Sequence, residues 1–250
     1  MIEKQRRRVS SFACFGAAIL AAWAALEPTG ARAESAVVAV PLMRYGLGML
    51  ECAAYSPNPD APLVATGGGI GVVLWDANTG DQVRILSAPG HHVSSVAFSP
   101  DGSKLLTGSY DATAKLWDAA TGAEIRTFSG HTNSVNSVAL SPDGTKILTG
   151  AGGWGDAPDH TAKLWDAATG AEIRTFSGHI FDFTCVAFSP DGTKVLTGSR
   201  DYTAELWDAG TAAMVRTFSG HTNEVNSIAF SPDGTKILTG AGWPDNTAKL

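Results

Sequence analysis

The sequence predicts an all-β fold built from a repeated unit, and three observations support that prediction. The dipeptide Trp-Asp recurs at separations of 42, 48 and 42 residues, at Trp75, Trp117, Trp165 and Trp207. A Pro-Asp-Gly turn recurs with the same separations, at Pro100, Pro142, Pro190 and Pro232. Helical periodicity is almost absent after residue 30. A unit of this length cannot bury its own apolar faces, so successive units must stack to make a core.

The segment 119–165 is the clearest unit, and it predicts four strands in order. Residues 124–128 alternate in the manner of a half-buried strand, and 135–140 form a second strand with Val and Leu on the buried side. A tight turn follows at 141–144, where Pro142 fixes φ and Gly144 supplies the positive φ that other residues resist. Residues 146–149 and 161–165 predict the third and fourth strands.

Four strands per unit, with a Gly-His loop before the second strand and Trp-Asp after the fourth, resemble the WD-repeat β-propeller family. The resemblance covers about residues 36–250, and it is reinforced by Thr-Ala-Lys-Leu at Thr113, Thr161 and Thr247. It implies radially arranged four-stranded blades, each packed on its neighbours. We expect four complete repeats plus a truncated fifth, because another Trp-Asp is due after Leu250. On this interpretation the chain is a fragment of a larger ring, and residues 36–42 form its closing strand.

In this family a His, a strand hydroxyl, an Asp and the Trp often form a hydrogen-bonded chain that pins each blade. The resemblance implies two complete sets of such pins: His131, Thr149, Asp159 and Trp165, then His179, Thr197, Asp201 and Trp207. An imidazole that bridges a buried carboxylate and hydroxyl satisfies groups that would otherwise cost about 1 to 3 kcal/mol each. The last unit has His221, Thr239 and Asp245 without the Trp. In the unit closed by Trp117, Pro89 takes the His position and displaces His91 and His92 to the loop tip.

Catalytic and metal-binding motifs are missing from the sequence. There is no His-x-x-x-His, Cys-x-x-Cys, phosphate-binding Gly loop or Gly-x-Ser-x-Gly. The Asp-Gly pairs resemble calcium loops only superficially, because they lack the further oxygen ligands that the ion requires. We therefore expect no enzyme activity, no metal, no cofactor and no small-molecule substrate.

Departures from the repeat cluster in loops that we expect on one rim of the disc. In one Gly-His loop Thr-Asn-Ser becomes Ile180-Phe181-Asp182, which predicts an apolar tip, whereas Phe183 takes the position of Val135 and is expected in the core. Two other loops are longer than their neighbours and carry Trp154 and Trp243; the alternative interpretation is that these two side chains fold back and cover the blade ends. The candidate partner-binding residues are Tyr110, Trp154, Phe181, Arg200, Tyr202 and Trp243, because exposed aromatic and Arg side chains are typical of binding hot spots.

Residues 1–33 have the pattern of an export signal, which leaves 34–250 as the WD-repeat domain. Lys4 to Arg8 form a basic region, 12–26 an apolar one, and Ala31-Arg32-Ala33 a cleavage site, so cleavage is expected between Ala33 and Glu34. The apolar run is shorter than the roughly 20 residues that span a bilayer. An uncleaved anchor is the alternative. The mature chain is expected in the periplasm or secreted, without membrane insertion.

Charge and cysteine content narrow the classes of function. The formal net charge is −6, and the signal segment is basic, so the remainder is more acidic still. This argues against a surface that follows nucleic-acid phosphates. Cys52 and Cys185 occupy the same repeat position three units apart, too far for a disulfide that needs Cα atoms within about 7 Å. Both are expected to be small buried hydrophobes.

The sequence thus favours a non-catalytic, exported scaffold that binds a protein or peptide partner through the rim carrying the Gly-His loops and the pinning Asp residues. Two alternatives remain open. One is a carbohydrate-binding or enzymatic propeller of the cell envelope, whose only carboxylate candidates are Asp156, Asp159, Asp182 and Asp245. The other is a sensor or interaction module of a longer multidomain protein.

Overall fold

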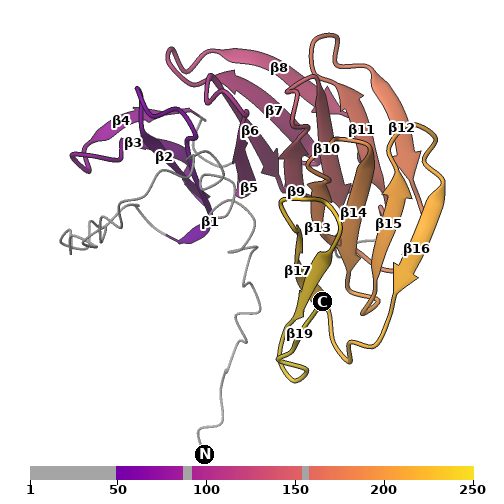
Figure 1. Ribbon diagram of the computed structural model, residues 1–250. Helices are drawn as coiled ribbons and strands as arrows, with labels where there is room; N and C mark the ends of the chain where they lie inside the picture. The colour runs from indigo at the N-terminus through magenta and orange to yellow at the C-terminus, as the bar shows by residue number, and fades with distance from the viewer. Residues whose placement is uncertain (1–48, 87–91, 154–157) are drawn as a thin grey trace, which may run out of the picture.

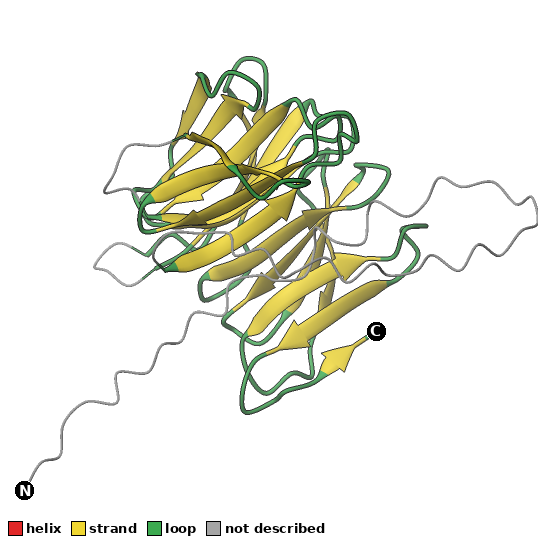
Figure 2. Cartoon of the chain, turned by 90° about the vertical axis from the view of Figure 1, so that its left-hand side faces the viewer, coloured by secondary structure: helices red, strands yellow, loops and turns green. Residues whose placement is uncertain are grey.

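Nineteen strands make up the regular secondary structure of the part of the chain that the computed structural model describes, residues 49–86, 92–153 and 158–250. Figure 2 shows these strands and no helix in that part. The strands form five antiparallel sheets that follow one another around an arc, from β1 at one end to β19 at the other (Figure 1). The all-β prediction is confirmed, and the arrangement is that of propeller blades with an incomplete fifth sheet.

The first three sheets have four strands each, hydrogen-bonded in chain order. The first contains β1 (Leu50–Tyr55), β2 (Leu63–Gly68), β3 (Gly71–Asp76) and β4 (Gln82–Ile85). The second contains β5 (Val93–Phe98), β6 (Lys104–Ser109), β7 (Thr113–Asp118) and β8 (Glu124–Ser129). The third contains β9 (Val135–Leu140), β10 (Lys146–Ala151), β11 (Ala162–Asp166) and β12 (Glu172–Phe176).

The last two sheets complete the arc. The fourth contains β13 (Phe183–Phe188), β14 (Lys194–Ser199), β15 (Ala204–Asp208) and β16 (Met214–Phe218). The fifth has three strands in the described residues, β17 (Val225–Phe230), β18 (Ile237–Ala241) and β19 (Ala248–Lys249).

The sequence unit and the sheet are out of phase by one strand. The unit 119–165 begins with β8, but β8 pairs with β7 of the second sheet, whereas β9, β10 and β11 belong to the third. The fourth strand of the third sheet is β12, which the next unit supplies. The four strands predicted for one unit therefore do not share a sheet, and each unit instead links two neighbouring sheets.

The apolar core lies between neighbouring sheets. Trp165 of the third sheet packs against Phe128 of the second with ring centroids 5.9 Å apart, and Trp207 packs against Phe176 in the same way at 5.7 Å. Phe176 and Phe183 are fully buried, so the core position expected for Phe183 is confirmed. Burying one such side chain contributes about 1.5 to 3 kcal/mol. Stacking of successive sheets thus buries the faces that no sheet could bury alone.

An arginine on the outer strand fastens each of the first three sheets to the next. Arg126 on β8 donates from Nη1 to Thr169 O at 2.8 Å, in the turn between β11 and β12. The neighbouring Gly170 has φ of +79°, and a Cβ there would lie 2.8 Å from Arg126 Cδ. Glycine is therefore required both for the turn and for the close approach of the arginine. Arg84 and Arg174 make equivalent bonds, to Ala120 O and Gly210 O.

The two cysteines of the described residues are buried and not bridged, as expected. Each thiol points at a backbone carbonyl of the next sheet, Cys52 at Val93 O and Cys185 at Val225 O, both at 3.7 Å. Burial, with a smaller contribution from the neighbouring negative charge of Glu51, raises the pKa of Cys52 to about 12. Cys52 is therefore an uncharged packing residue at neutral pH.

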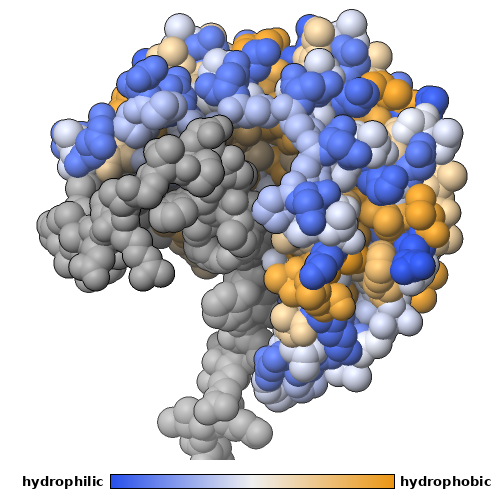
Figure 3. Space-filling view, viewed as in Figure 1, coloured by the Kyte–Doolittle hydropathy of each residue, from blue (hydrophilic) through white to orange (hydrophobic). Residues whose placement is uncertain are grey.

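A groove of about 910 Å³ opens between β16 and the fifth sheet. Its walls include Phe218, Phe230 and Ile237, and Figure 3 shows hydrophobic residues gathered at this end of the arc. Phe218 corresponds to Phe128 and Phe176, but the guanidinium of Arg216 lies over its ring, at 5.9 Å from the centroid.

Several expectations fall on residues that the structure does not describe. These are the export signal 1–33, the closing strand 36–42, the displaced Pro89 and His91, and Trp154 with Asp156.

Candidate functional site

The polar centre of the third sheet is a chain of four buried side chains. His131 Nδ1 lies 2.9 Å from Asp159 Oδ2, and its Nε2 lies 2.7 Å from Thr149 Oγ1. Trp165 Nε1 donates to the same Thr149 oxygen at 2.9 Å. The backbone N–H of Thr132 donates to Asp159 Oδ2 at 2.8 Å. The chain ties the loop that enters the sheet to the loop between β10 and β11.

The fourth and fifth sheets repeat this arrangement. His179 lies 2.9 Å from both Asp201 Oδ2 and Thr197 Oγ1, and Trp207 Nε1 donates to Thr197 at 3.0 Å. In the fifth sheet His221 Nδ1 lies 3.3 Å from Asp245 Oδ1 and its Nε2 2.9 Å from Thr239 Oγ1.

The carboxylates of these chains are strongly stabilised in their charged form. Burial alone would raise the pKa of Asp159, but hydrogen bonds from His131, Thr161 and the Thr132 backbone outweigh burial and hold the pKa at about 2. The pKa of Asp201 is also about 2, since the bonds from His179 and Thr203 outweigh burial there. Both groups carry a charge at neutral pH and are occupied by structural partners, so neither is suited to general acid chemistry.

The second sheet departs from the pattern in the way its sequence does. Trp117 Nε1 donates to Thr107 Oγ1 at 3.0 Å, but His92 turns toward the first sheet, where its Nδ1 lies 3.1 Å from Glu51 Oε1. The His92 ring stacks on Tyr110, whose hydroxyl donates to Glu51 Oε2 at 2.7 Å. Burial, followed by the bond to Glu51, raises the pKa of the Tyr110 hydroxyl. Glu51 thus joins the first two sheets.

Antiparallel pairing brings two sets of loops to the same end of the sheets. The loop entering each sheet and the loop between its second and third strands lie at one end, and the histidine chains join them. We call this end the loop face; its described segments are 68–71, 92, 109–113, 129–134, 151–153, 158–161, 177–182, 199–203, 219–224 and 241–247, together with Glu51 at the start of β1.

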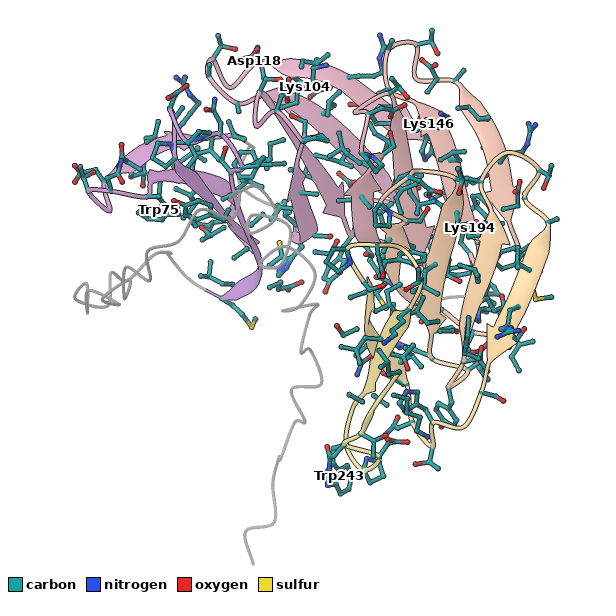
Figure 4. The ribbon with its side chains drawn as sticks, viewed as in Figure 1. Trp75, Lys104, Asp118, Lys146, Lys194 and Trp243 are labelled. Atoms are coloured by element: carbon teal, nitrogen blue, oxygen red, sulfur yellow. The ribbon has the colours of Figure 1, made fainter. Side chains whose placement is uncertain are left out.

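Five of the six candidate partner-binding residues lie on the loop face in the described residues, and Trp154 lies outside them. Exposed fractions are 45% for Tyr110, 53% for Phe181, 45% for Tyr202 and 74% for Trp243. Trp243 lies in the loop between β18 and β19, at the far end of the arc in Figure 4. With three quarters of its surface exposed, it does not cover the end of its sheet.

The apolar tip predicted at 180–182 needs a correction. Ile180 and Phe181 are exposed, but Asp182 is buried. Asp182 Oδ2 lies 3.3 Å from Arg200 Nη1, and its Oδ1 lies 3.3 Å from His160 Nδ1. The carboxylate at position 182 can be buried because a cationic and a polar side chain from two other loops lie beside it and compensate for the loss of water.

These contacts continue into a strip that crosses three sheets. Beside Asp182, the His160 ring meets the edge of Phe181 at 6.5 Å between centroids. On the other side, Arg200 Nε lies 3.7 Å from Glu224 Oε1. The backbone O of Glu224 accepts from Gly242 N at 3.2 Å, next to Trp243. We call this set the rim strip: Phe181, His160, Asp182, Arg200, Glu224 and Trp243.

Sequence reasoning missed three residues of this face, Glu51, His160 and Glu224. All three had a readable signal. Glu224 stands where the loop of the third sheet has Ser134, and His160 stands where the loop of the second sheet has Ala112. Glu51 precedes Cys52 and stands where the fourth sheet has Thr184, before Cys185.

The carboxylates considered for an enzymatic propeller are not available to act together on a substrate. Asp159 and Asp245 are held by histidines and Asp182 by Arg200, while Asp156 is not described. Within the described residues, no three His, Cys, Asp or Glu side chains are placed to hold a metal ion. The same residues contain no helix long and apolar enough to cross a membrane.

Comparison with known proteins identifies the repeats. The family model described as WD domain, G-beta repeat matches four segments, 80–118, 122–166, 170–208 and 213–250, which together cover more than half of the chain. No curated protein matches the chain significantly. The matched segments coincide with the units whose histidine and tryptophan side chains are described above, and the chain therefore belongs to the WD-repeat family.

Proposed function

We propose that the protein is a non-catalytic scaffold that binds a protein or peptide partner through its loop face. WD repeats generally mediate protein–protein interaction. The observation that supports this use of the loop face is the exposure of Phe181, Tyr202 and Trp243 beside Arg200. Trp, Tyr and Arg are the residue types that dominate binding energy at protein interfaces.

The energetics favour these side chains as contact residues. Covering an exposed aromatic side chain contributes about 1.5 to 3 kcal/mol from its apolar surface. Arg200 is held between Asp182 and Glu224, so less conformational entropy is lost when a partner contacts it. In contrast, the buried histidines of the third and fourth sheets have their ring nitrogens occupied and serve the scaffold.

A capture experiment tests the proposal. The parent protein and a Phe181→Ala, Trp243→Ala variant of equal thermal stability serve as baits in extracts of the source cells. The matched control is Val83→Ala, Ile85→Ala, which removes two exposed apolar side chains from the outer strand β4, outside the segments that define the loop face. A partner retained by the parent and the control but lost by the loop-face variant supports the proposal. Equal capture by all three proteins contradicts it.

Carbohydrate binding is a second candidate, favoured by the exposed indole of Trp243. An indole face of this kind stacks on sugar rings, with nearby polar groups fixing orientation. A glycan array compared between the parent and Trp243→Ala separates the two candidates. Glycan signals that the variant retains would exclude this residue as a sugar platform.

We further propose that the protein is exported and that residues 1–33 are removed. The support is the basic, apolar and Ala-Arg-Ala succession of the first 33 residues. N-terminal sequencing of the protein recovered from cell fractions tests it. Glu34 as the first residue, in a periplasmic or secreted fraction, is expected. Intact Met1 in the cytosol would contradict export.

A further inference from the structure

We infer that the loop face recognises a basic peptide segment, in which Lys or Arg side chains alternate with a large apolar side chain. The inference rests on the proposed function of the loop face as a contact surface and adds the chemistry of the partner. Its support is the distribution of charge between the two ends of the sheets, together with the geometry of the rim strip.

The net charge is more negative on the loop face than at the opposite ends of the sheets. The described carboxylates there are Glu51, Asp111, Asp159, Asp182, Asp201, Glu224 and Asp245. Arg200 is the one Lys or Arg in the described segments of the loop face. At the opposite ends of the sheets each Asp-Gly turn is followed by a lysine, and the arginines of the outer strands reach the other turns. Lys104, Lys146 and Lys194 follow one another along the arc in Figure 4. The turns at that end hold ten Asp against four Lys and the three arginines that reach them, a net charge of −3, whereas the loop face has seven carboxylates against one Arg, a net charge of −6.

The carboxylates of the loop face keep their charge. Hydrogen bonds outweigh burial at Asp159 and Asp201 and hold each pKa at about 2. The pKa of Asp245 is also lowered, chiefly by bonds from Thr247 and the Thr222 backbone. Such fixed charges add up over a surface and attract an oppositely charged ligand even where they do not contact it.

Local geometry provides two anionic positions beside apolar ones. Arg200 carries one positive charge between two carboxylates, those of Asp182 and Glu224, so this cluster is net negative when His160 is neutral. The Glu224 side chain is 39% exposed and accessible to a ligand. Phe181 and Trp243 flank the cluster along the rim strip. This spacing suits a peptide whose cationic group meets Glu224 while its apolar side chain covers an aromatic ring.

Glu51 provides the second anionic position, a carboxylate whose side chain is only 10% exposed and which acts on a ligand through its charge rather than by contact. Its carboxylate is fixed by His92 at 3.1 Å and by Tyr110 at 2.7 Å, and it has no Lys or Arg partner among the described residues. The positive charge of Arg200 acts on the Tyr110 hydroxyl, opposing the rise in its pKa from burial and from Glu51. Arg200 of the rim strip is therefore within electrostatic range of the tyrosine that holds Glu51.

Matched peptides test the inference directly. Three fluorescein-labelled peptides share one Trp and one Leu and differ only in whether the remaining positions are Lys and Arg, Gln and Ser, or Glu and Asp. Fluorescence anisotropy with the whole protein is measured at low and high salt, about 50 and 300 mM. We expect the basic peptide to bind at least about tenfold more tightly than the others at low salt, and to lose that advantage at high salt, because exposed charges are screened.

Matched variants locate the charge that matters. Glu51→Gln, Glu224→Gln removes two negative charges from the loop face while preserving side-chain shape. Asp60→Asn, Asp81→Asn removes two exposed charges from the turns at the opposite ends of the sheets. We expect the first pair to weaken binding of the basic peptide by about fivefold, chiefly through the exposed Glu224, because Glu51 is mostly buried and acts at longer range. The second pair should change it by less than about twofold.

The outcomes separate the inference from the proposed function. Equal binding of the three peptides, or equal effects of the two variant pairs, overturns a basic partner. If the neutral or acidic peptide then binds best, and Phe181→Ala, Trp243→Ala removes that binding, the loop face is still a contact surface with another chemistry. If no peptide is sensitive to the Phe181 and Trp243 substitutions, both proposals fail.

Discussion

Glu205 Oε2 lies 3.5 Å from His179 Nε2, inside the fourth sheet. The equivalent residue of the third sheet is Lys163, which reaches Glu172 at 2.8 Å instead. In the fourth sheet the Glu172 position is Met214, so both members of the lysine–glutamate pair have been exchanged. The result is a buried carboxylate, 5% exposed, whose Oε2 accepts no hydrogen bond from the described residues.

Replacing Glu205 by Gln should change the pH dependence of stability. Burial, partly offset by the charge of His179, raises the pKa of Glu205 above its ordinary value of 4.5. A raised pKa gives stability that is present below about pH 4.5 and is lost as pH rises through the folded-state value. The Gln side chain of Glu205→Gln does not ionise, so this variant keeps that stability at high pH. The free energy of unfolding of the variant, relative to that of the parent, should therefore increase with pH. Urea unfolding between pH 4 and 8 measures this difference.

Glu172→Gln is the control for that experiment, with the opposite sign. Bonds from Lys163 and Thr175 outweigh burial and lower the pKa of Glu172. This variant should therefore become less stable than the parent as pH rises above the unfolded pKa. Parallel pH profiles for the two variants would contradict the assignment.

Thr149→Val should destabilise the protein more than Thr107→Val. Thr149 Oγ1 serves both His131 and Trp165, whereas Thr107 Oγ1 receives Trp117 and contacts no histidine in the described residues. Each buried polar group left without a partner costs about 1 to 3 kcal/mol. We expect a loss of about 2 to 4 kcal/mol for Thr149→Val and about half of that for Thr107→Val. Urea unfolding monitored by tryptophan fluorescence compares them, and equal losses would exclude a special role for the histidine.

Acid should unfold the repeats through their buried aspartates. The folded-state pKa of Asp159 and Asp201 is about 2, against an ordinary value of 3.8. A lowered pKa gives stability that is present above the unfolded value and is lost as pH falls toward the folded one, here from about pH 4 to 2. Asp159→Asn should be less stable at pH 7 and should show a flatter profile over this window. Circular dichroism during acid titration tests this, with the exposed Asp60→Asn expected to follow the parent.

The arginine contacts between sheets should contribute measurable stability. Arg126→Met keeps the apolar stem of the side chain and removes the bonds to Thr169 O and Ala168 O. Since these bonds are solvent-exposed, we expect a loss of about 1 kcal/mol. Arg216→Met is the matched control, because among the described residues Arg216 lies over Phe218 and bonds no neighbouring turn. An equal decrease in melting temperature for both variants would argue against a stabilising contact between Arg126 and the turn of the next sheet.

Cys52 and Cys185 should resist alkylation in the native state. Both are buried, and burial raises the pKa of Cys52 to about 12, so little thiolate forms at pH 8. Iodoacetamide labelling with peptide-level mass spectrometry should modify both residues only after denaturant is added. Rapid native labelling of either thiol would show that its sheet opens locally.

Strand positions were predictable from the sequence because the same pattern recurs in successive units. A segment that is ambiguous in one unit can be assigned from the equivalent segments of the others. The expected strand 135–140 is β9 as observed, and 161–165 became β11 (Ala162–Asp166), one residue later. The phase between unit and sheet was not predictable from the pattern, because periodicity fixes the length of the unit but not which neighbour pairs with its first strand. Only the pairing of β8 with β7 shows it.

The candidate site was predictable in its residue types but not in its pairings. Exposure of Phe181 and Trp243 follows from their place in repeat-breaking loops, whereas burial of Asp182 depends on His160 and Arg200, which come from two other loops. Such pairings between loops far apart in sequence leave no local pattern. Glu205 was overlooked although Thr-Ala-Glu-Leu breaks the Thr-Ala-Lys-Leu repeat, because a strand position that alternates outward suggests a solvated side chain.

The one-strand offset between unit and sheet also bears on how such an array can lengthen. A duplication of one unit inserts the outer strand of one sheet together with the first three strands of the next, and with them the loop that carries the histidine. The first strand of the inserted copy therefore pairs with the sheet before it. Its other three strands form a new sheet, whose fourth strand comes from the following unit. Growth by whole units creates no new kind of contact, which allows gene duplication to extend the arc without redesigning any interface.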